Sequence, residues 1–378
     1  MKKISLGTLV VGLVFSVDAH CQSSVTLYGL VDAGVGYISN QGGASAFQMA
    51  TRSASFYGFR GTEDLGGGYR AIFWLESGFS TANGSIANGG TLFGRQAQVG
   101  LSAPWGQITM GNQYDAVVDE LQVFSSSGTF AGNLGAESGD VNNIWADFHV
   151  NNSVKFSSAT FHGLSAEAMY GFGGVAGSMS TKSIYSAGAA YRSGQLAIGV
   201  AYLNINNPIT AVYQGTTAPA NTQTLGTPFS SPIYTGYASA RTLQIAGMGA
   251  SYAIGTITVN ALYSNTEFRS ITPTPGGNQR LNAHFNNFEL NQTFLATPSV
   301  ALSLGGIYTS ATGANYEQVV GGVNYLLSKR TGLYILGAWV RANGIDSRGR
   351  PAVADIANAV ASTTRNQIAI RTGIRMRF

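Results

Sequence analysis

Few side chains in this 378-residue chain could act as acids, bases or nucleophiles in catalysis. Histidine is the most frequent general base, and beyond residue 21 the chain holds only His149, His162 and His284. The sequence has no Gly-x-Ser-x-Gly, His-Glu-x-x-His or P-loop motif. Glycine-rich stretches such as 171–174 lack the strand-to-helix context of a nucleotide site. We therefore expect no catalytic residue, no metal and no cofactor.

The charged side chains are better candidates for function, because they are scarce and unevenly placed. They make up 10% of the chain, where roughly 25% is typical. One segment is more acidic than the rest and carries Asp115, Asp119, Glu120, Glu137, Asp140 and Asp147. The basic candidates are Arg52, Arg60, Arg95 and Lys155, with His149, which titrates near neutral pH if exposed. The net charge of +4 is too small and scattered to indicate nucleic acid binding.

The first 21 residues have the three-part pattern of a secretory signal peptide. Two lysines precede the apolar run Ile4–Val17, which is shorter than the roughly 20 residues of a membrane-spanning helix. We expect cleavage after Cys21, the only cysteine, so that the mature chain 22–378 has no disulfide. A buried N-terminal helix is one alternative. A lipoprotein signal is another, although His20 stands where lipid-attached cysteines normally have a small residue.

The elements that must position these charges show a period of two residues. One parity is apolar and bulky, as in Ile257, Val259, Ala261 and Tyr263. The other parity is polar or small, as in Thr256, Thr258, Asn260 and Ser264. Glycine is also frequent, with 50 residues, about twice its average share. Strands with one face toward lipid and the other toward water have this alternation.

We predict a single all-β domain, a 16-stranded antiparallel transmembrane β-barrel. The expected strands are 25–39, 51–62, 69–79, 93–104, 107–113, 149–160, 164–173, 183–193, 195–206, 241–254, 256–267, 284–297, 299–310, 316–328, 331–343 and 365–378. Short turns alternate with long Gly/Ser/Thr/Asn/Pro segments such as 207–240 and 344–364. Short periplasmic turns and long external loops give this alternation in an even-stranded barrel.

The C-terminus carries an apolar row that ends on an aromatic residue. Ile368, Ile370, Thr372, Ile374, Met376 and Phe378 share one parity. Arg371, Gly373, Arg375 and Arg377 share the other. A terminal phenylalanine in such a row resembles the signal that barrel-assembly machinery recognises in outer-membrane proteins, so that machinery is an expected partner.

Several longer motifs resemble the general porins of β-proteobacteria, the neisserial-like family of Gram-negative outer-membrane porins. The stretch 23–32, Ser-Ser-Val-Thr-Leu-Tyr-Gly-Leu-Val-Asp, resembles the first strand of that family. Gly-Phe-Arg-Gly-Thr-Glu-Asp-Leu-Gly-Gly-Gly at 58–68 and Ala-Ile-Phe-Trp-Leu-Glu at 71–76 resemble the second hairpin. Further matches are Arg-Gln-Ala at 95–97, Val-Gly-Leu at 99–101, Tyr-Asp-Ala-Val-Val-Asp at 114–119 and Val-Asn-Asn-Ser-Val-Lys-Phe at 150–156.

The resemblance implies a homotrimer of barrels in the outer membrane, in contact with its lipid. Each barrel would hold a water-filled pore for passive transport of ions and small hydrophilic solutes. It also implies that one long loop, here about 114–148, folds inward and narrows the pore. Acidic side chains on that loop would face basic side chains on the barrel wall.

Strand parity and the resemblance together give the expected pore lining. The basic set is Arg52, Arg60, Arg95, His149 and Lys155, and the acidic set is Asp115, Asp119, Glu120, Glu137 and Asp140. The family usually carries arginine where this chain has Phe56 and His149. We therefore expect weaker anion selectivity than in close relatives. Protonation of an exposed His149 at lower pH would shift selectivity toward anions.

Two other classes of outer-membrane barrel are the alternatives. A hydrolase would need a Ser/His/acid arrangement, for which the chain offers few histidines. A surface adhesin or autotransporter would need a passenger segment of different period before a smaller barrel. Alternation begins at Val25, immediately after the expected signal peptide, which leaves only the loops to bind partners.

Overall fold

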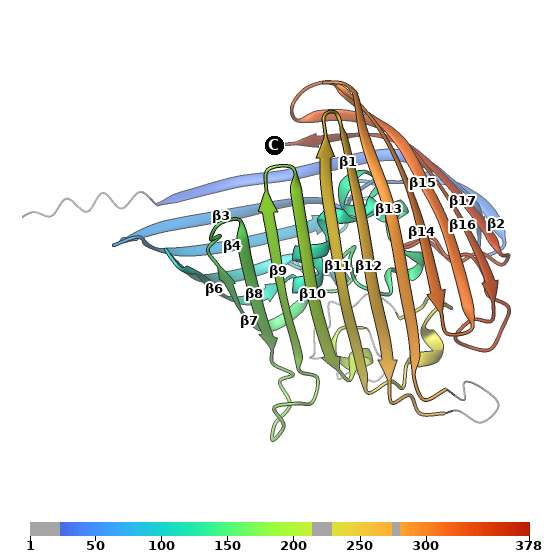
Figure 1. Cartoon of the computed structure of the whole chain (residues 1–378), viewed down its shortest axis with the longest axis horizontal. Helices are drawn as coiled ribbons and strands as arrows, with labels where there is room; N and C mark the ends of the chain where they lie inside the picture. Colours follow the sequence, from blue (N-terminus) through green and yellow to red (C-terminus); the bar gives the residue numbers. More distant parts are fainter. Residues whose placement is uncertain (1–22, 214–228, 274–279) are drawn as a thin grey trace, which may run out of the picture.

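The structure is a computed structural model that describes residues 23–213, 229–273 and 280–378 (Figure 1). The expected signal peptide lies outside these residues. The described residues form seventeen β-strands, in chain order β1 (Ser24–Gln41), β2 (Ala44–Met49), β3 (Ser55–Gly66), β4 (Tyr69–Phe79), β5 (Gln96–Ala103), β6 (Gly106–Gln113), β7 (Val150–Ser158), β8 (Leu164–Gly171), β9 (Ile184–Ser193), β10 (Leu196–Asn206), β11 (Thr242–Ile254), β12 (Ile257–Arg269), β13 (Ala283–Thr297), β14 (Val300–Ala311), β15 (Ala314–Leu326), β16 (Thr331–Gly344) and β17 (Asn366–Arg377).

Short helical elements occupy the connections between strands. The α-helices are α1 (Ala116–Leu121) and α2 (Pro208–Ala211). Single helical turns are η1 (Asn88–Gly90), η2 (Gln122–Phe124), η3 (Ser127–Ala131), η4 (Gly132–Gly135), η5 (Ser138–Asp140) and η6 (Thr235–Tyr237). Within the described part of the chain, no helix has both the length and the hydrophobicity needed to cross a membrane.

The strands form one closed antiparallel sheet. From β3 onward each strand pairs with the next in sequence, as far as β17. The last strand then pairs with the first, so that Leu30 lies opposite Arg377 and Ile38 opposite Ala369. A closed sheet has no edge of unpaired backbone groups, which is the condition for strands to cross a bilayer. The predicted antiparallel barrel is confirmed.

β2 and β3 together occupy one strand position of the barrel, which is interrupted at residues 50–54. The C-terminal half of β1 pairs with β2, where Val35 lies opposite Met49. The N-terminal half pairs with β3, where Leu30 lies opposite Phe56. Because β2 and β3 share one position, the seventeen strand segments form the 16-stranded barrel that the sequence predicted.

The side chain of Asp32 stabilises this interruption. Its carboxylate accepts hydrogen bonds from the backbone N–H groups of Arg52 at 3.3 Å and Ser53 at 3.2 Å. The hydroxyl of Tyr334 on β16 donates to the same carboxylate at 2.7 Å. These contacts replace the sheet hydrogen bonds that are missing at the interruption between β2 and β3. The strand predicted at 51–62 therefore starts later than expected, and Arg52 lies in the break and not on a strand.

Exposure alternates along the strands as the sequence pattern predicts. On β17, Ile368, Ile370 and Ile374 are exposed on the outside of the barrel, whereas Ala369 and Arg371 are buried on the inside. Removal of apolar surface from water favours this orientation only when lipid covers the outside. The alternation therefore defines an outer face for hydrocarbon and an inner face for polar contacts.

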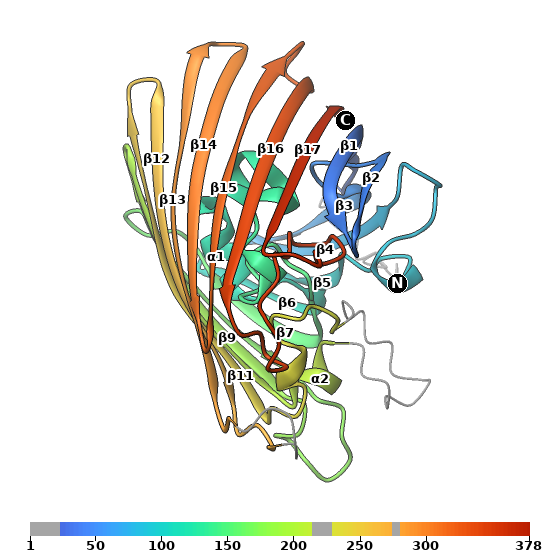
Figure 2. The same cartoon turned by 90° about the vertical axis from the view of Figure 1, so that its right-hand side faces the viewer.

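The segment 114–149 connects β6 to β7 and lies inside the barrel, where Figure 2 shows α1 surrounded by strands. Its helix begins at Asp115, whose side chain accepts hydrogen bonds from the backbone N–H groups of Val117 and Val118. This is an ordinary N-cap, which supplies partners for amides that the first helical turn leaves free. The inward loop expected at about 114–148 thus has its own local support.

Glycines on the inner wall make room for this loop. A Cβ atom at Gly249 on β11 would lie 2.3 Å from the ring of Phe124, and one at Gly199 on β10 would lie 2.6 Å from the carbonyl oxygen of Glu120. A Cβ at Gly247 would lie 2.6 Å from Leu121. Contacts this short require the neighbouring atoms to move, so larger residues at Gly199 and Gly249 would displace the loop backbone or the ring of Phe124.

Substitution of Gly249 by valine tests this packing. We expect Gly249→Val to destabilise the folded barrel by about 1–3 kcal/mol, because an overpacked site must move its neighbours. The measurement is the temperature at which the folded protein converts to its unfolded mobility in SDS gels. Gly306→Val is the matched control, since nothing lies within 4 Å of a Cβ on this outward-facing strand glycine. Equal loss of stability in both variants would contradict the assignment.

Candidate pore constriction

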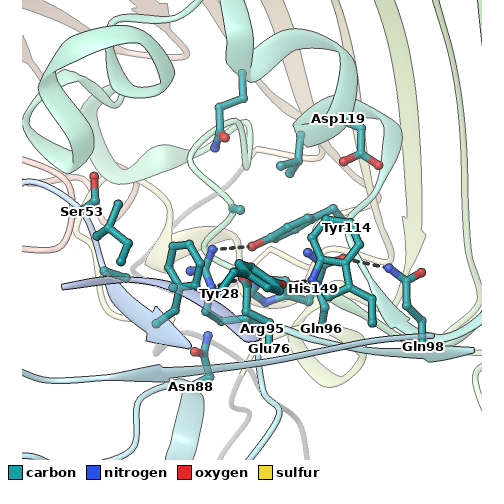
Figure 3. Close-up of a pocket in the computed structure, with 18 of the residues that line it drawn as sticks. Tyr28, Ser53, Glu76, Asn88, Arg95, Gln96, Gln98, Tyr114, Asp119 and His149 are labelled. Carbon is teal, nitrogen blue, oxygen red and sulfur yellow. Dashed lines mark hydrogen bonds and ion pairs between the residues drawn. The ribbon is translucent and has the colours of Figure 1, made fainter. Parts of the chain in front are cut away.

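The inward loop and the barrel wall enclose an open cavity of about 1440 Å³, part of which is drawn in Figure 3. Its basic lining residues are Arg52, Arg60, Arg95, Lys155, Arg375 and Arg377. Its acidic lining residues are Glu76, Asp119, Asp147 and Glu167. Opposite charges on the wall and the loop therefore face one water-accessible space.

Arg95 lies just before β5 and is held by a carboxylate on β4. Its Nε atom is 2.5 Å from Oε1 of Glu76, and one terminal nitrogen donates to the hydroxyl of Tyr114 at 2.8 Å. The hydroxyl of Tyr28 donates to Oε2 of Glu76 at 2.9 Å. Both oxygens of this carboxylate are thus engaged, and Arg95 has a fixed position at the cavity wall.

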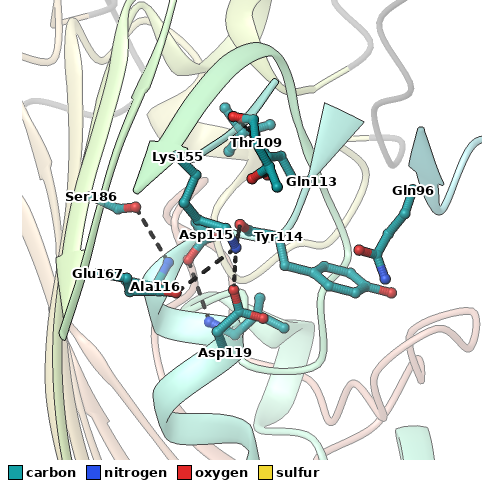
Figure 4. A network of polar contacts seen from close by, with 12 residues as sticks. Gln96, Thr109, Gln113, Tyr114, Asp115, Ala116, Asp119, Lys155, Glu167 and Ser186 are labelled. Carbon is teal, nitrogen blue, oxygen red and sulfur yellow. Dashed lines mark hydrogen bonds and ion pairs between the residues drawn. The ribbon is translucent and has the colours of Figure 1, made fainter. Parts of the chain in front are cut away.

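Lys155 on β7 links the loop to the wall, as Figure 4 shows. Its ammonium group is 2.5 Å from Oδ2 of Asp119 on α1 and 3.9 Å from Oε2 of Glu167 on β8. It also donates to the backbone carbonyl of Tyr114 at 3.1 Å. This lysine therefore neutralises part of the negative charge that α1 brings into the cavity.

Arg52 has a structural contact with the loop in addition to its place in the lining. Its guanidinium donates to the side-chain oxygen of Asn324 at 2.7 Å and to the backbone carbonyl of Thr129 at 3.1 Å. The side chain is almost fully buried. Arg52 thus joins the segment between β2 and β3 to the inward loop and presents little charge to solvent.

Aromatic rings surround Arg60 and Phe56 on β3. The guanidinium of Arg60 lies 4.4 Å from the ring centre of Tyr28 and 3.9 Å from that of Trp74. The ring of Phe56 lies 4.8 Å from the guanidinium carbon of Arg95. The expectation that Phe56 and Arg60 face inward agrees with their place in the cavity lining.

Three of the acids expected at the pore are enclosed within the loop. Asp115 is fully buried as the N-cap of α1 and also accepts from the side chain of Asn143 at 2.9 Å. Asp140 is buried and accepts from the backbone N–H of Trp145 at 3.0 Å. Glu137 is completely inaccessible to solvent. Expecting these carboxylates in the pore lining was wrong, because all three are enclosed in the loop, where Asp115 and Asp140 accept hydrogen bonds that stabilise its turns.

Burial determines how the enclosed acids ionise. It raises the pKa of Asp115 to about 6, and it raises the pKa of Asp140 well above its ordinary value. The pKa of Glu137 is also raised by burial. Glu120 is the fourth departure from the expectation: its carboxylate lies 3.7 Å from Arg192 on β9 and outside the cavity lining. Asp119 is the expected acid that the cavity does expose.

His149 contributes to the cavity lining, but it is not the exposed residue that the pH hypothesis required. Its side chain is only 4% exposed, and its ring lies 4.7 Å from the ring of Tyr114. Burial and the nearby charge of Arg95 lower the pKa of His149 to about 3. The imidazole stays neutral at physiological pH, so the expectation that it drives a pH response is wrong.

Several lining residues were absent from the expected set. Glu76, Glu167, Arg375 and Arg377 all lie on the inner parity of their strands. Arg375 and Arg377 alternate with the exposed residues of the C-terminal row, so parity alone could have placed them inside. Asp147 lines the cavity and accepts from the side chain of Asn358 at 3.1 Å.

Comparison with known sequences agrees with this geometry. Residues 7–344 match the profile of the family described as Gram-negative porin. The chain belongs to the Gram-negative porin family. The porin is 28% identical over 360 residues to an outer membrane porin protein of Bordetella pertussis, with 86% of this chain and 91% of that protein covered. It is 29% identical to outer membrane porin protein 32 of Delftia acidovorans, with both chains fully covered.

Solved structures show the same fold. The anion-selective porin from Comamonas acidovorans superposes with a TM-score of 0.72 at 22% identity, and 94% of this chain and all of that one are covered. The trimer form of OmpT from Vibrio cholerae superposes with a TM-score of 0.63 at 16% identity, covering 94% of this chain and 99% of that one. The expected family, fold and outer-membrane location of this porin are thereby confirmed.

The pH dependence of ion selectivity should follow Asp147. Burial raises the pKa of its carboxyl to about 6. Above that pH the group is a carboxylate, and below it the cavity loses one negative charge. We expect the zero-current potential in a KCl gradient to shift toward anions between pH 8 and pH 5.

Two variants separate the contribution of Asp147 from that of His149. Asp147→Asn should reduce the shift, because no carboxyl remains to titrate at this position. His149→Gln should keep it, because the buried imidazole is already neutral over this pH range. A shift that vanishes in His149→Gln and persists in Asp147→Asn would contradict this account.

Proposed function

We propose that this porin is a general diffusion pore whose ion selectivity is weak and is set by the wall and the inward loop together. The observation that supports the proposal is the lining of the 1440 Å³ cavity, where basic and acidic side chains face the same space. Charge on the walls of a narrow pore determines which ions pass. Small hydrophilic solutes would pass by diffusion, within the limits of the pore diameter.

The balance of free charge favours modest anion selectivity. Arg95 is paired with Glu76, and Lys155 is paired with Asp119, so these four side chains contribute little net field. Phe56 supplies no charge at a position where the family resemblance leads us to expect arginine. We infer that the pore is less anion-selective than relatives that have the arginine.

The substitution Phe56→Arg tests this inference. A unit charge roughly 10 Å from a permeating ion contributes about 1–2 kcal/mol at an effective dielectric constant near 20. We expect a several-fold rise in the chloride-to-potassium permeability ratio, measured by zero-current potentials at pH 8 in a salt gradient.

Phe161→Arg is the matched control for this charge. Phe161 is 74% exposed in the turn between β7 and β8 and lies outside the cavity lining, so its substitution should leave the permeability ratio unchanged. Strong anion preference in the unsubstituted porin would refute weak selectivity. No response to Phe56→Arg would show that this position does not influence the pore.

We further propose that the porin assembles as a homotrimer in the outer membrane. The outer parity of β1 carries small or apolar residues such as Gly29, Val31 and Ala33, which suits close contact with another barrel. Analytical ultracentrifugation of the detergent-solubilised porin would give its oligomeric mass, and a monomeric mass would contradict the trimer.

We also propose that processing and assembly use the two ends of the chain. Cleavage after Cys21 would release the mature chain, and barrel-assembly machinery would recognise the row that ends at Phe378. The terminal residue exchanges two 3.1 Å backbone hydrogen bonds with Gly29, so it continues the sheet. The intact mass of the exported chain would identify the cleavage site.

We propose no enzymatic activity for this barrel. His149 is buried against Tyr114, and among the described residues neither ring nitrogen has a hydrogen-bond partner. His162 lies in the turn before β8, where its backbone has a φ of +49°. Neither environment offers a nucleophile with an adjacent base, and His284, whose Nδ1 lies 3.0 Å from Oγ1 of Thr312, is outside the cavity lining. Phospholipid release by the purified porin would contradict the proposal.

A further inference from the structure

One part of the cavity wall combines aromatic rings with arginines that form no ion pair within 4 Å among the described residues. The register of the sheet places Phe56 and Arg377 on either side of Leu30, on the inner parity of three adjacent strands. Adjacent strands are about 4.8 Å apart, so the Cα atoms of these two residues are separated by roughly 10 Å. An apolar side chain therefore lies between a guanidinium and an aromatic ring.

The aromatic side of this region is firmly held. The ring of Tyr28 lies across Gly58, where a Cβ atom would be 2.8 Å from the ring carbon that bears the hydroxyl. Its hydroxyl reaches Glu76 and also accepts from the indole nitrogen of Trp74. The ring of Phe56 meets that of Tyr28 edge to face, at a centroid distance of 6.2 Å. These rings are fixed in place before any solute arrives.

The arginines here differ from the other basic residues of the lining. Among the described residues, Arg60, Arg375 and Arg377 form no ion pair within 4 Å, unlike Arg95 and Lys155. The guanidinium of Arg60 lies over the rings of Tyr28 and Trp74 and also hydrogen-bonds to the side chain of Tyr28.

The acid nearest to these arginines in the sheet register is already engaged. Asp32 lies opposite Arg375, between β1 and β17. Its carboxylate accepts hydrogen bonds from the hydroxyl of Tyr334 and from the backbone of residues 52–53. Because those donors are neutral, the charge of Asp32 still acts on Arg375, whereas Arg377 forms no ion pair within 4 Å among the described residues and is the arginine most available to a solute.

We propose that this arginine–aromatic shelf, formed by Tyr28, Phe56, Arg60, Trp74, Arg375 and Arg377, is a binding subsite for small aromatic carboxylates. The carboxylate would accept hydrogen bonds from the guanidinium edges, which match its planar geometry. The aromatic ring would lie against Phe56, which lines the cavity, because Leu30 is only 5% exposed and offers little surface. An aliphatic anion would gain the first contact only, and a neutral aromatic would gain the second only.

The inference rests on the proposed diffusion pore and adds a solute class to it. Planar bilayer recording with KCl on both sides tests the two separately. Stepwise KCl conductance reports the pore itself, whatever happens at the shelf. Added potassium benzoate should reduce the single-channel current in a saturable manner. Potassium acetate and benzyl alcohol at equal concentration should each do so much less.

Substitutions then assign any block to the shelf. Arg377→Gln should raise the half-blocking benzoate concentration about tenfold, the equivalent of about 1.4 kcal/mol. Phe56→Leu should raise it roughly threefold, because it keeps an apolar group and removes the aromatic contact. Arg330→Gln is the matched control, since Arg330 lies exposed in the turn between β15 and β16 and outside the cavity lining.

Saturation-transfer NMR on the detergent-solubilised porin supplies a readout that does not depend on current or on any variant. Benzoate protons should receive saturation from the protein, and an excess of acetate should reverse this poorly. Equal block by benzoate and acetate, or unchanged block in both shelf variants, would overturn the proposal. So would the absence of both saturation transfer and block in channels that conduct KCl. Channels that fail to conduct KCl at all would refute the pore instead.

Discussion

The structure depends on one constraint: backbone groups that cross hydrocarbon must be paired within the protein. The closed sheet meets it by pairing β17 with β1. At residues 50–54 the strand formed by β2 and β3 is interrupted. There the carboxylate of Asp32 accepts hydrogen bonds from the backbone N–H groups of Arg52 and Ser53 instead. The same junction directs Arg52 toward the inward loop, which it contacts at Thr129. A local solution to a pairing problem thus also anchors the loop that shapes the pore.

Four of the loop's carboxylates fall into two groups with different physical roles. Asp115 and Asp140 accept backbone or amide hydrogen bonds and are buried, so they hold turns in place. Asp119 and Asp147 line the cavity, where Asp119 is paired with Lys155 and the charge of Asp147 acts on the space through which ions would move. The loop therefore needs acids for its own folding as well as for its electrostatic effect. For this reason the number of acidic residues in the loop is larger than the number whose charge acts on the pore.

The sequence predicts the barrel well because its signal is repeated in every strand. Alternation, turn spacing and the C-terminal row placed most strands within a few residues of their observed bounds. Inward wall residues such as Arg60 and Lys155 followed from the same parity. The same parity places Arg375 and Arg377 inside the barrel, because they alternate with the apolar C-terminal row, although the expected lining did not include them.

Features that depend on tertiary contacts were less accessible to sequence reasoning. Along β7 a bulge beside Asn152, which has a φ of +51°, places both Val150 and Ser153 inside. An uninterrupted period of two would separate these residues onto opposite faces. The burial of His149 and Glu137 likewise depends on how the loop folds against the wall. No local pattern marks those two side chains as enclosed.

The most direct test of the central account is the single-channel conductance of the purified porin in planar bilayers, combined with solute uptake into liposomes. The account predicts stepwise, passive conductance in KCl and entry of small neutral sugars at rates that fall with molecular size. Absence of conductance steps from correctly folded protein, or uptake independent of solute size, would contradict a water-filled pore narrowed by the inward loop.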